Sequence, residues 1–203
     1  MDKKQHWETV FASKQQNEVS WFQPVPNSSI EFLESYNISK KSNIIDVGSG
    51  DSFFIDYLVE NGYENIYSLD ISENALLRLK NRLGSKSDKV NWIVSDVLDL
   101  SANVQFDYWH DRAAFHFLSD PDDVNKYISI TKDYISTNGK MMVATFSDSG
   151  PLKCSGLNIK QYSKDELNNK FSQFYTKIKC VDETHITPFN TNQNFTYCSF
   201  KKK

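Results

Sequence analysis

Asp46, Asp70 and the turn Gly48-Ser49-Gly50 have the types and spacing needed to bind a nucleoside-bearing ligand. The turn follows the apolar run Asn43–Val47 and precedes a helical pattern. Such a turn leaves backbone N–H groups pointing outward, and its glycines let a ligand approach them. Asp70 lies 22 residues after Gly48, at the end of a second apolar run. An acid at that place accepts hydrogen bonds from ribose hydroxyls.

The neighbouring residues discriminate between cofactors. A dinucleotide fingerprint needs a third glycine where this chain has Phe53, which is too large for close helix–strand packing. Asp46 would lie unfavourably beside a pyrophosphate, and it suits a ligand with a cationic end. Asp96 is placed to accept the exocyclic amine of an adenine between the apolar walls Ile71 and Val97, although it could also cap a helix. Adenine, ribose and a charged amino-acid tail together describe S-adenosylmethionine.

The elements that must position these residues alternate between strand and helix. Helices are predicted to begin near Phe53, Ser72 and Asp120, where capping residues precede apolar positions at helical spacing. Short apolar runs between them predict five parallel strands, and a short link near the C-terminus requires an antiparallel pair. The seven predicted strands of this doubly wound α/β sheet cover residues 43–47, 66–70, 90–95, 106–110, 140–146, 175–183 and 195–201.

Residues 1–36 are predicted to form a cap or lid on a main domain that covers residues 37–203. This segment is polar but contains Trp7, Phe11, Trp21 and Phe22. Trp21 and Phe22 could close over the cofactor, or they could only pack the cap against the core.

Four motifs in order resemble those of the class I S-adenosylmethionine-dependent methyltransferases. They are Ile44–Gly50, Leu69–Ser72, Ser95–Val97 and Phe106–Asp111, and the resemblance covers roughly residues 40–200. It implies a Rossmann-like fold, S-adenosylmethionine as methyl donor, S-adenosylhomocysteine as product and an activity in class EC 2.1.1. The implied cofactor-binding residues are Trp21, Asp46, Gly48, Ser49, Gly50, Asp70, Ile71, Asp96, Val97 and His110.

The segment Trp109–Leu118 indicates a subgroup within this family. With Glu18–Gln23, Lys153–Leu157 and Phe195–Cys198 it is similar to a bacterial subgroup of small methyltransferases. The layout is more distantly similar to lysine methyltransferases of elongation factor and citrate synthase. Those enzymes carry Asp-Lys-Gly where this chain has Asp111-Arg112-Ala113.

His116, Asp111 and Arg112 are the candidate catalytic residues, because they follow the fourth strand, where the resemblance places the acceptor. Methyl transfer is an in-line displacement, which needs alignment and a dry site more than a base. Arg112 could instead form a structural ion pair with Asp111 or Asp120. His116 lies among aromatic residues and could be a packing residue.

Composition sets the remaining expectations. The net charge is −3 and the only basic run is Lys201-Lys202-Lys203, which does not favour nucleic-acid binding. No apolar run is long enough to cross a bilayer, and the N-terminus does not resemble a secretory signal. We therefore expect a cytoplasmic monomer or homodimer. The three cysteines are widely spaced, which favours reduced thiols and no metal site.

The sequence thus leaves three functions open. The first is methyl transfer to a small-molecule acceptor, because the aromatic cap would cover the site. The second is methylation of protein lysine residues, supported by the distant similarity at Asp111. The third is a cofactor-binding module that has lost catalysis.

Overall fold

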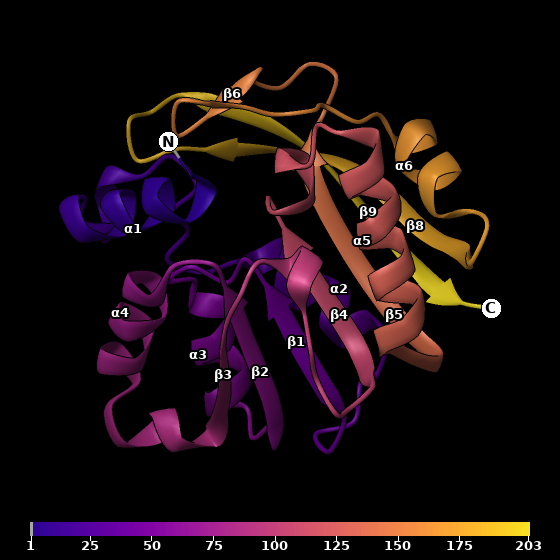
Figure 1. The fold of residues 1–203 in the computed structure, drawn as a ribbon, viewed down its shortest axis with the longest axis horizontal. Helices are drawn as coiled ribbons and strands as arrows, with labels where there is room; N and C mark the ends of the chain where they lie inside the picture. The colour runs from indigo at the N-terminus through magenta and orange to yellow at the C-terminus, as the bar shows by residue number, and fades with distance from the viewer. Residues whose placement is uncertain (1) are drawn as a thin grey trace.

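The computed structural model describes residues 2–203, which form one seven-stranded sheet covered by helices on both faces (Figure 1). The strand order is β3-β2-β1-β4-β5-β9-β8. The strands are β1 Asn43–Val47, β2 Asn65–Asp70, β3 Val90–Val94, β4 Phe106–Arg112, β5 Ile135–Phe146, β8 Tyr175–Ile186 and β9 Asn192–Lys202. A separate two-stranded sheet pairs β6 Lys153–Cys154 with β7 Leu157–Asn158.

The predicted topology is confirmed. Strands β1 to β5 pair in parallel, whereas β9 pairs antiparallel with both β5 and β8. The structure differs from the prediction at the start of β5, which begins at Ile135, directly after the preceding helix, and not at Lys140. Asn138 has a φ of +62°, and the β4–β5 register shifts between Phe106 and Tyr108. The Asn138-Gly139 pair therefore lies inside an irregular strand.

Helices begin directly after residues whose side chains cap them. Ser72 accepts a hydrogen bond from the N–H of Ala75, and Ser163 forms a reciprocal capping box with Glu166. The six α-helices within residues 2–203 are α1 Lys3–Ser13, α2 Asn27–Ser35, α3 Phe53–Glu60, α4 Glu73–Leu83, α5 Pro121–Tyr134 and α6 Lys164–Phe171.

The core has one layer on each side of the sheet. Apolar side chains of α2, α3 and α4 pack on one face, and those of α5 and α6 pack on the other. Parallel pairing of β1 with β4 places Asp46 opposite His110, and pairing of β1 with β2 places Val47 opposite Leu69. The carboxyl ends of β1, β2 and β4 therefore meet at one edge of the sheet.

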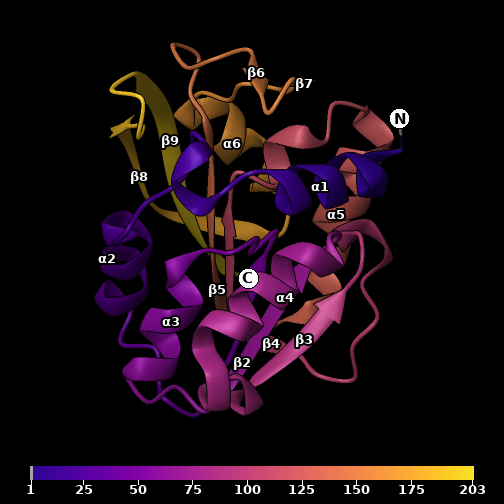
Figure 2. The same ribbon diagram turned by 90° about the vertical axis from the view of Figure 1, so that its left-hand side faces the viewer.

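Helix α1 lies across that edge (Figure 2). The Glu8 carboxylate accepts hydrogen bonds from the Ser72 hydroxyl at 2.8 Å and from the N–H groups of Glu73 and Asn74 at the start of α4. Arg78 of α4 donates to the carbonyls of Phe11 and Lys14. These contacts fasten the N-terminal segment to the edge of the sheet where the carboxyl ends of β1, β2 and β4 meet. That residues 1–36 act as a cap separate from the main domain stays a prediction.

The prediction of three reduced cysteines is wrong. Cys180 and Cys198 form a disulfide between β8 and β9, and Cys154 is the free cysteine. The antiparallel register places the two residues directly opposite each other, with their Cα atoms 4.2 Å apart. Sequence spacing did not show this proximity, because it depends on the register of the hairpin.

None of the helices in residues 2–203 combines the length and the apolar character needed to cross a membrane. Within the same residues no group of three or more histidine, cysteine or acidic side chains could hold a metal ion.

Candidate active site

A cavity lies at the carboxyl ends of β1, β2 and β4, beneath the N-terminal segment. The structure brings all ten predicted cofactor-binding residues to it: Trp21, Asp46, Gly48, Ser49, Gly50, Asp70, Ile71, Asp96, Val97 and His110. Of the three candidate catalytic residues, Arg112 also lines this cavity, whereas Asp111 and His116 do not.

The glycine turn is rigid and closely packed. Gly48 has a φ of +62°, a conformation that favours glycine, and a Cβ atom there would lie 2.7 Å from the Cβ of Ala114. The Ser49 hydroxyl is 2.7 Å from that of Ser68, and the Ser49 N–H donates to the carbonyl of Leu69. A Cβ at Gly50 would lie 3.1 Å from the ring of Phe11. The turn therefore holds a narrow space open between the sheet and the N-terminal segment.

Asp70 is oriented by two backbone hydrogen bonds. Its Oδ2 accepts from the N–H of Gly50 and its Oδ1 from the N–H of Ser72, each at 2.8 Å. Burial raises the pKa of Asp70 to about 6, although both hydrogen bonds oppose this shift. Each carboxylate oxygen has a second lone pair, so the side chain can still accept hydrogen bonds from two ribose hydroxyls.

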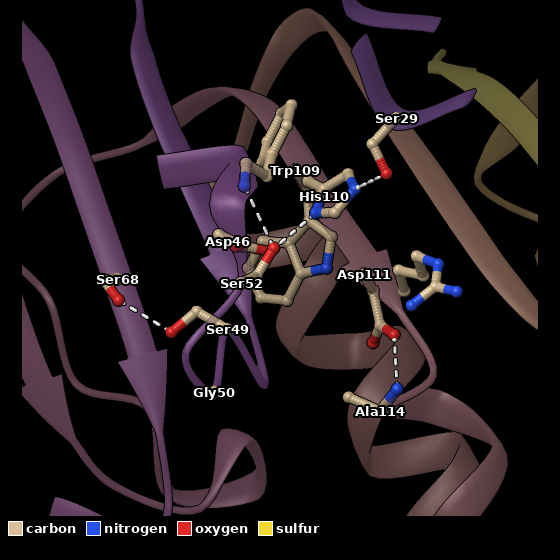
Figure 3. A network of polar contacts seen from close by, with 12 residues as sticks. Ser29, Asp46, Ser49, Gly50, Ser52, Ser68, Trp109, His110, Asp111 and Ala114 are labelled. Carbon is tan, nitrogen blue, oxygen red and sulfur yellow. Dashed lines mark hydrogen bonds and ion pairs between the residues drawn. The ribbon is translucent and has the colours of Figure 1, made fainter. Parts of the chain in front are cut away.

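His110 connects Asp46 with the N-terminal segment (Figure 3). Its Nδ1 lies 2.6 Å from Oδ1 of Asp46, and its Nε2 lies 2.8 Å from the hydroxyl of Ser29 on α2. The ring stacks on Phe54 at 4.1 Å between centroids. The other oxygen of Asp46, Oδ2, is buried and has no hydrogen-bond partner within residues 2–203. A buried carboxylate oxygen without a partner fits the ammonium group of the cofactor's amino-acid tail.

Asp96 caps a short helix and also lines the cavity. It caps the helix Val97–Asp99 by accepting a hydrogen bond from the N–H of Leu98 at 2.9 Å. The cap fixes one carboxylate oxygen, Oδ1, and the other can accept an adenine amine beside Ile71.

Asp111 supports the loop that follows β4. It is fully buried and accepts hydrogen bonds from the N–H groups of Ala114 and Phe115 and, at 2.6 Å, from the hydroxyl of Tyr127. Burial raises its pKa to about 6. Because Ala114 packs against Gly48, Asp111 is connected to the glycine turn through this loop.

His116 is fully buried between Phe117 and Phe146. Its Nδ1 accepts a hydrogen bond from the N–H of Phe146 at 3.2 Å. Burial, with a smaller contribution from Arg112, lowers its pKa to about 3, so the imidazole is neutral near pH 7.

Arg112 does not form the ion pair with Asp111 or Asp120 that the sequence left open. Its Nε donates to the Tyr197 hydroxyl at 3.0 Å, and its Nη1 donates to the carbonyl of Trp21 at 3.3 Å. Neighbouring residues of a strand point to opposite faces of the sheet, which separates the Arg112 and Asp111 side chains. No salt bridge of Arg112 occurs within residues 2–203.

An aromatic roof covers the cavity and is formed by Trp7, Phe11, Trp21 and Phe117. The sequence indicated Trp21 as a residue that could close over the cofactor, and it missed the other three. Trp7 packs edge-on against Trp21 and Phe117, with centroids 5.9 and 5.1 Å apart. The spacing of four residues between Trp7 and Phe11 on a helix could have indicated a shared face. No sequence signal identified Phe117 or the contacts of Glu8.

Comparison with known proteins agrees with this site. Residues 38–198 match the family model described as a methyltransferase domain. The EEF1A lysine methyltransferase 2 of Danio rerio is 28% identical over 57% of this chain and 53% of its own length. The human EEF1A lysine methyltransferase 2 is 24% identical over 87% of this chain and 75% of its own length. The chain thus spans about half of the first relative and three quarters of the second.

Solved structures share the fold. The N-methyltransferase NodS from Bradyrhizobium japonicum, in complex with S-adenosylhomocysteine, superposes with a TM-score of 0.75 at 15% identity, covering 99% of both chains. A protein studied for the conversion of a disulfide into a thioacetal during echinomycin biosynthesis gives 0.80 at 16% identity, covering 98% and 93%. The 1,6-didemethyltoxoflavin-N1-methyltransferase of Burkholderia thailandensis gives 0.71 at 16% identity, covering 88% and 77%. The chain therefore belongs to the methyltransferase domain family, as a class I member that uses S-adenosylmethionine.

Proposed function

We propose that the protein transfers the methyl group of S-adenosylmethionine to a small-molecule acceptor. The observation that carries this proposal is the aromatic roof. Trp7, Phe11 and Trp21 belong to the N-terminal segment, and Glu8 and Arg78 fasten that segment over the carboxyl ends of the strands. A compact acceptor fits beneath such a cover more readily than a side chain on a folded protein.

The residues of this chain supply alignment and exclusion of water. Bound S-adenosylmethionine supplies an electrophilic methyl group on a sulfonium. Asp46 holds the amino-acid tail of the cofactor and Asp70 its ribose, and the roof keeps water from the reacting atoms, which favours in-line displacement. The carboxylates of Asp46 and Asp70 also suit the positive charge of the sulfonium cofactor.

We further propose that Asp111 and His116 are positioning and packing residues and not catalytic ones. Asp111 holds the loop that presses Ala114 against Gly48, and His116 accepts a backbone hydrogen bond inside the core. Of the three candidates, only Arg112 lines the cavity and is thus placed to contact an acceptor.

A lysine acceptor is the second candidate function, because both curated relatives described above are named as EEF1A lysine methyltransferases. Their identity to this chain is 24–28%, and their acceptor is a property of those proteins. The small-molecule proposal is supported in turn by the name of the 1,6-didemethyltoxoflavin-N1-methyltransferase, which shares the fold.

The test uses S-adenosylmethionine with a tritiated methyl group, the purified protein and an extract of the source cells. We expect label in the fraction below about 1 kDa, and label confined to protein bands would contradict the proposal. An Asp46→Asn variant is the control, since it keeps the shape of the side chain and removes the charge that faces the cofactor. A cofactor-binding module that has lost catalysis would bind S-adenosylhomocysteine, as measured by calorimetry, but would give no labelled product in any fraction.

A further inference from the structure

Arg112 is a cation in the cavity wall without an acidic partner. Two of its guanidinium nitrogens have fixed partners, the Tyr197 hydroxyl and the Trp21 carbonyl. The third, Nη2, is buried and donates to no acceptor within residues 2–203. The guanidinium also lies over the Phe195 ring, 4.9 Å from its centroid. The side chain is thus held in place with one donor group unused.

The groups around Arg112 do not neutralise it. His116 and His185 are both held neutral near pH 7, because burial and then Arg112 itself lower their pKa values. Burial raises the pKa of Cys154 to about 12 and raises the pKa of Tyr197 above its ordinary value. Glu183 contributes to the raised pKa of Tyr197, and its carboxylate accepts a hydrogen bond from the hydroxyl of Ser28.

A partly buried guanidinium without a counter-ion is unfavourable, and it is stabilised when a ligand brings an anion to it. The planar fork of arginine pairs with the oxygens of a carboxylate or a phosphate through charge-assisted hydrogen bonds. The partners of Arg112 lie on β9 and in the loop before α2, whereas the acids that hold the cofactor lie at the ends of β1, β2 and β3. This places Arg112 on the side of the cavity away from the adenosine site.

We propose that Arg112 binds a carboxylate of the methyl acceptor, so that the substrate class is a small organic acid with an apolar body. This inference rests on the proposed function. The aromatic residues Trp21 and Phe117, which line the cavity together with Arg112, suit the apolar body. The cofactor carries a carboxylate too, so the experiment must separate the two sources.

The first arm of the test compares benzoate with its neutral isostere benzamide. The full-length protein is saturated with S-adenosylhomocysteine, and each compound is titrated by calorimetry. We expect benzoate to bind about tenfold more tightly or better, because a charge-assisted hydrogen bond contributes about 1.5–3 kcal/mol. Arg112→Gln should abolish this preference. Lys126→Gln, which removes an exposed cation paired with Asp99, is the matched control and should keep it.

The second arm assigns the carboxylate to its source. Affinities for S-adenosylhomocysteine and 5′-methylthioadenosine, which lacks the amino-acid tail, are measured in wild type and Arg112→Gln. An unchanged ratio of the two affinities supports the proposal. A selective loss of S-adenosylhomocysteine affinity assigns Arg112 to the cofactor carboxylate and overturns it.

The third arm needs no variant. Tritiated product made by the wild-type protein in extract is passed over a strong anion exchanger at pH 8, and retention is expected. Label only in the flow-through overturns the inference, as does equal binding of benzoate and benzamide with S-adenosylhomocysteine binding intact. Absence of S-adenosylhomocysteine binding by the wild type would instead overturn the proposed function, and this inference with it.

Discussion

Oδ1 of Asp46 lies 2.6 Å from Nδ1 of His110, and this contact follows from strand register. The two residues are directly opposite each other on β1 and β4. Because both side chains point to the same face, the imidazole orients the carboxylate and leaves Oδ2 for a ligand. His110 in turn contacts Ser29 of α2, so the acid at the cofactor site is connected to the N-terminal segment.

His110→Ala should weaken S-adenosylhomocysteine binding by about 1–3 kcal/mol, because it leaves a buried carboxylate oxygen unsatisfied. His110→Asn, whose amide can still donate to Asp46, should recover part of the loss. Calorimetry measures both. Equal affinities for wild type and His110→Ala would show that Asp46 does not depend on this contact.

Cofactor affinity should depend on pH through Asp70. Its pKa is raised to about 6, mainly by burial, and only the carboxylate form accepts hydrogen bonds from both ribose hydroxyls. Affinity for S-adenosylhomocysteine should therefore be full above pH 7 and fall as pH drops through about 6. Asp70→Asn should bind more weakly by ~1–3 kcal/mol and lose this pH dependence. Binding isotherms at pH 5, 6, 7 and 8 test this, and parallel profiles for the two proteins would refute it.

His116 should affect the stability of the folded protein at acidic pH, and it should not affect catalysis. The folded protein excludes a proton that the unfolded chain binds between about pH 6.5 and 3, so the free energy of unfolding falls as pH drops through this window. Asp70 and Asp111 act in the opposite direction between about pH 4 and 6, because their pKa values are raised in the folded protein.

The variant His116→Asn isolates the histidine contribution. Its amide oxygen can accept the N–H of Phe146, and it does not titrate. Denaturant melts at pH 7 and pH 5 should show a smaller loss of stability in the variant than in wild type. Turnover at pH 7 should persist. Abolished turnover with intact S-adenosylhomocysteine binding would restore His116 as a base.

The sequence predicted the sheet, and it predicted a set of residues that the structure brings to one cavity, because both depend on local patterns. Asp46, the glycine turn and Asp70 each stand at a strand end, and parallel pairing brings strand ends together whatever the details of packing. The positions of His116 and Trp7 depend instead on tertiary contacts between distant segments. His116 packs against Phe146 of β5, and Trp7 packs against Phe117. Neither contact leaves a periodic signal in the sequence.

The N-terminal segment should control access to the cofactor. Glu8 acts like a cap on α4, since it accepts hydrogen bonds from Ser72, Glu73 and Asn74. Glu8→Ala should destabilise the docking of α1 by about 0.5–2 kcal/mol, as loss of a helix cap does. Hydrogen exchange should then increase in residues 3–13, and S-adenosylhomocysteine should dissociate faster. Glu60→Ala removes an exposed carboxylate paired with Lys86 and is the control. Unchanged exchange in α1 would show that Glu8 does not hold it.

The disulfide between Cys180 and Cys198 should be detectable by counting thiols. Protein unfolded in guanidinium without reductant should show one reactive thiol, from Cys154, and three after reduction. The bond joins residues 18 apart, and closure of a loop of this size contributes up to about 3 kcal/mol. The net effect should be smaller, because the β8–β9 ladder already constrains both residues. Cys180→Ser should therefore lower the melting temperature in the absence of reductant, and reductant should abolish the difference from wild type. Three reactive thiols in protein purified without reductant would restore the expectation drawn from the sequence.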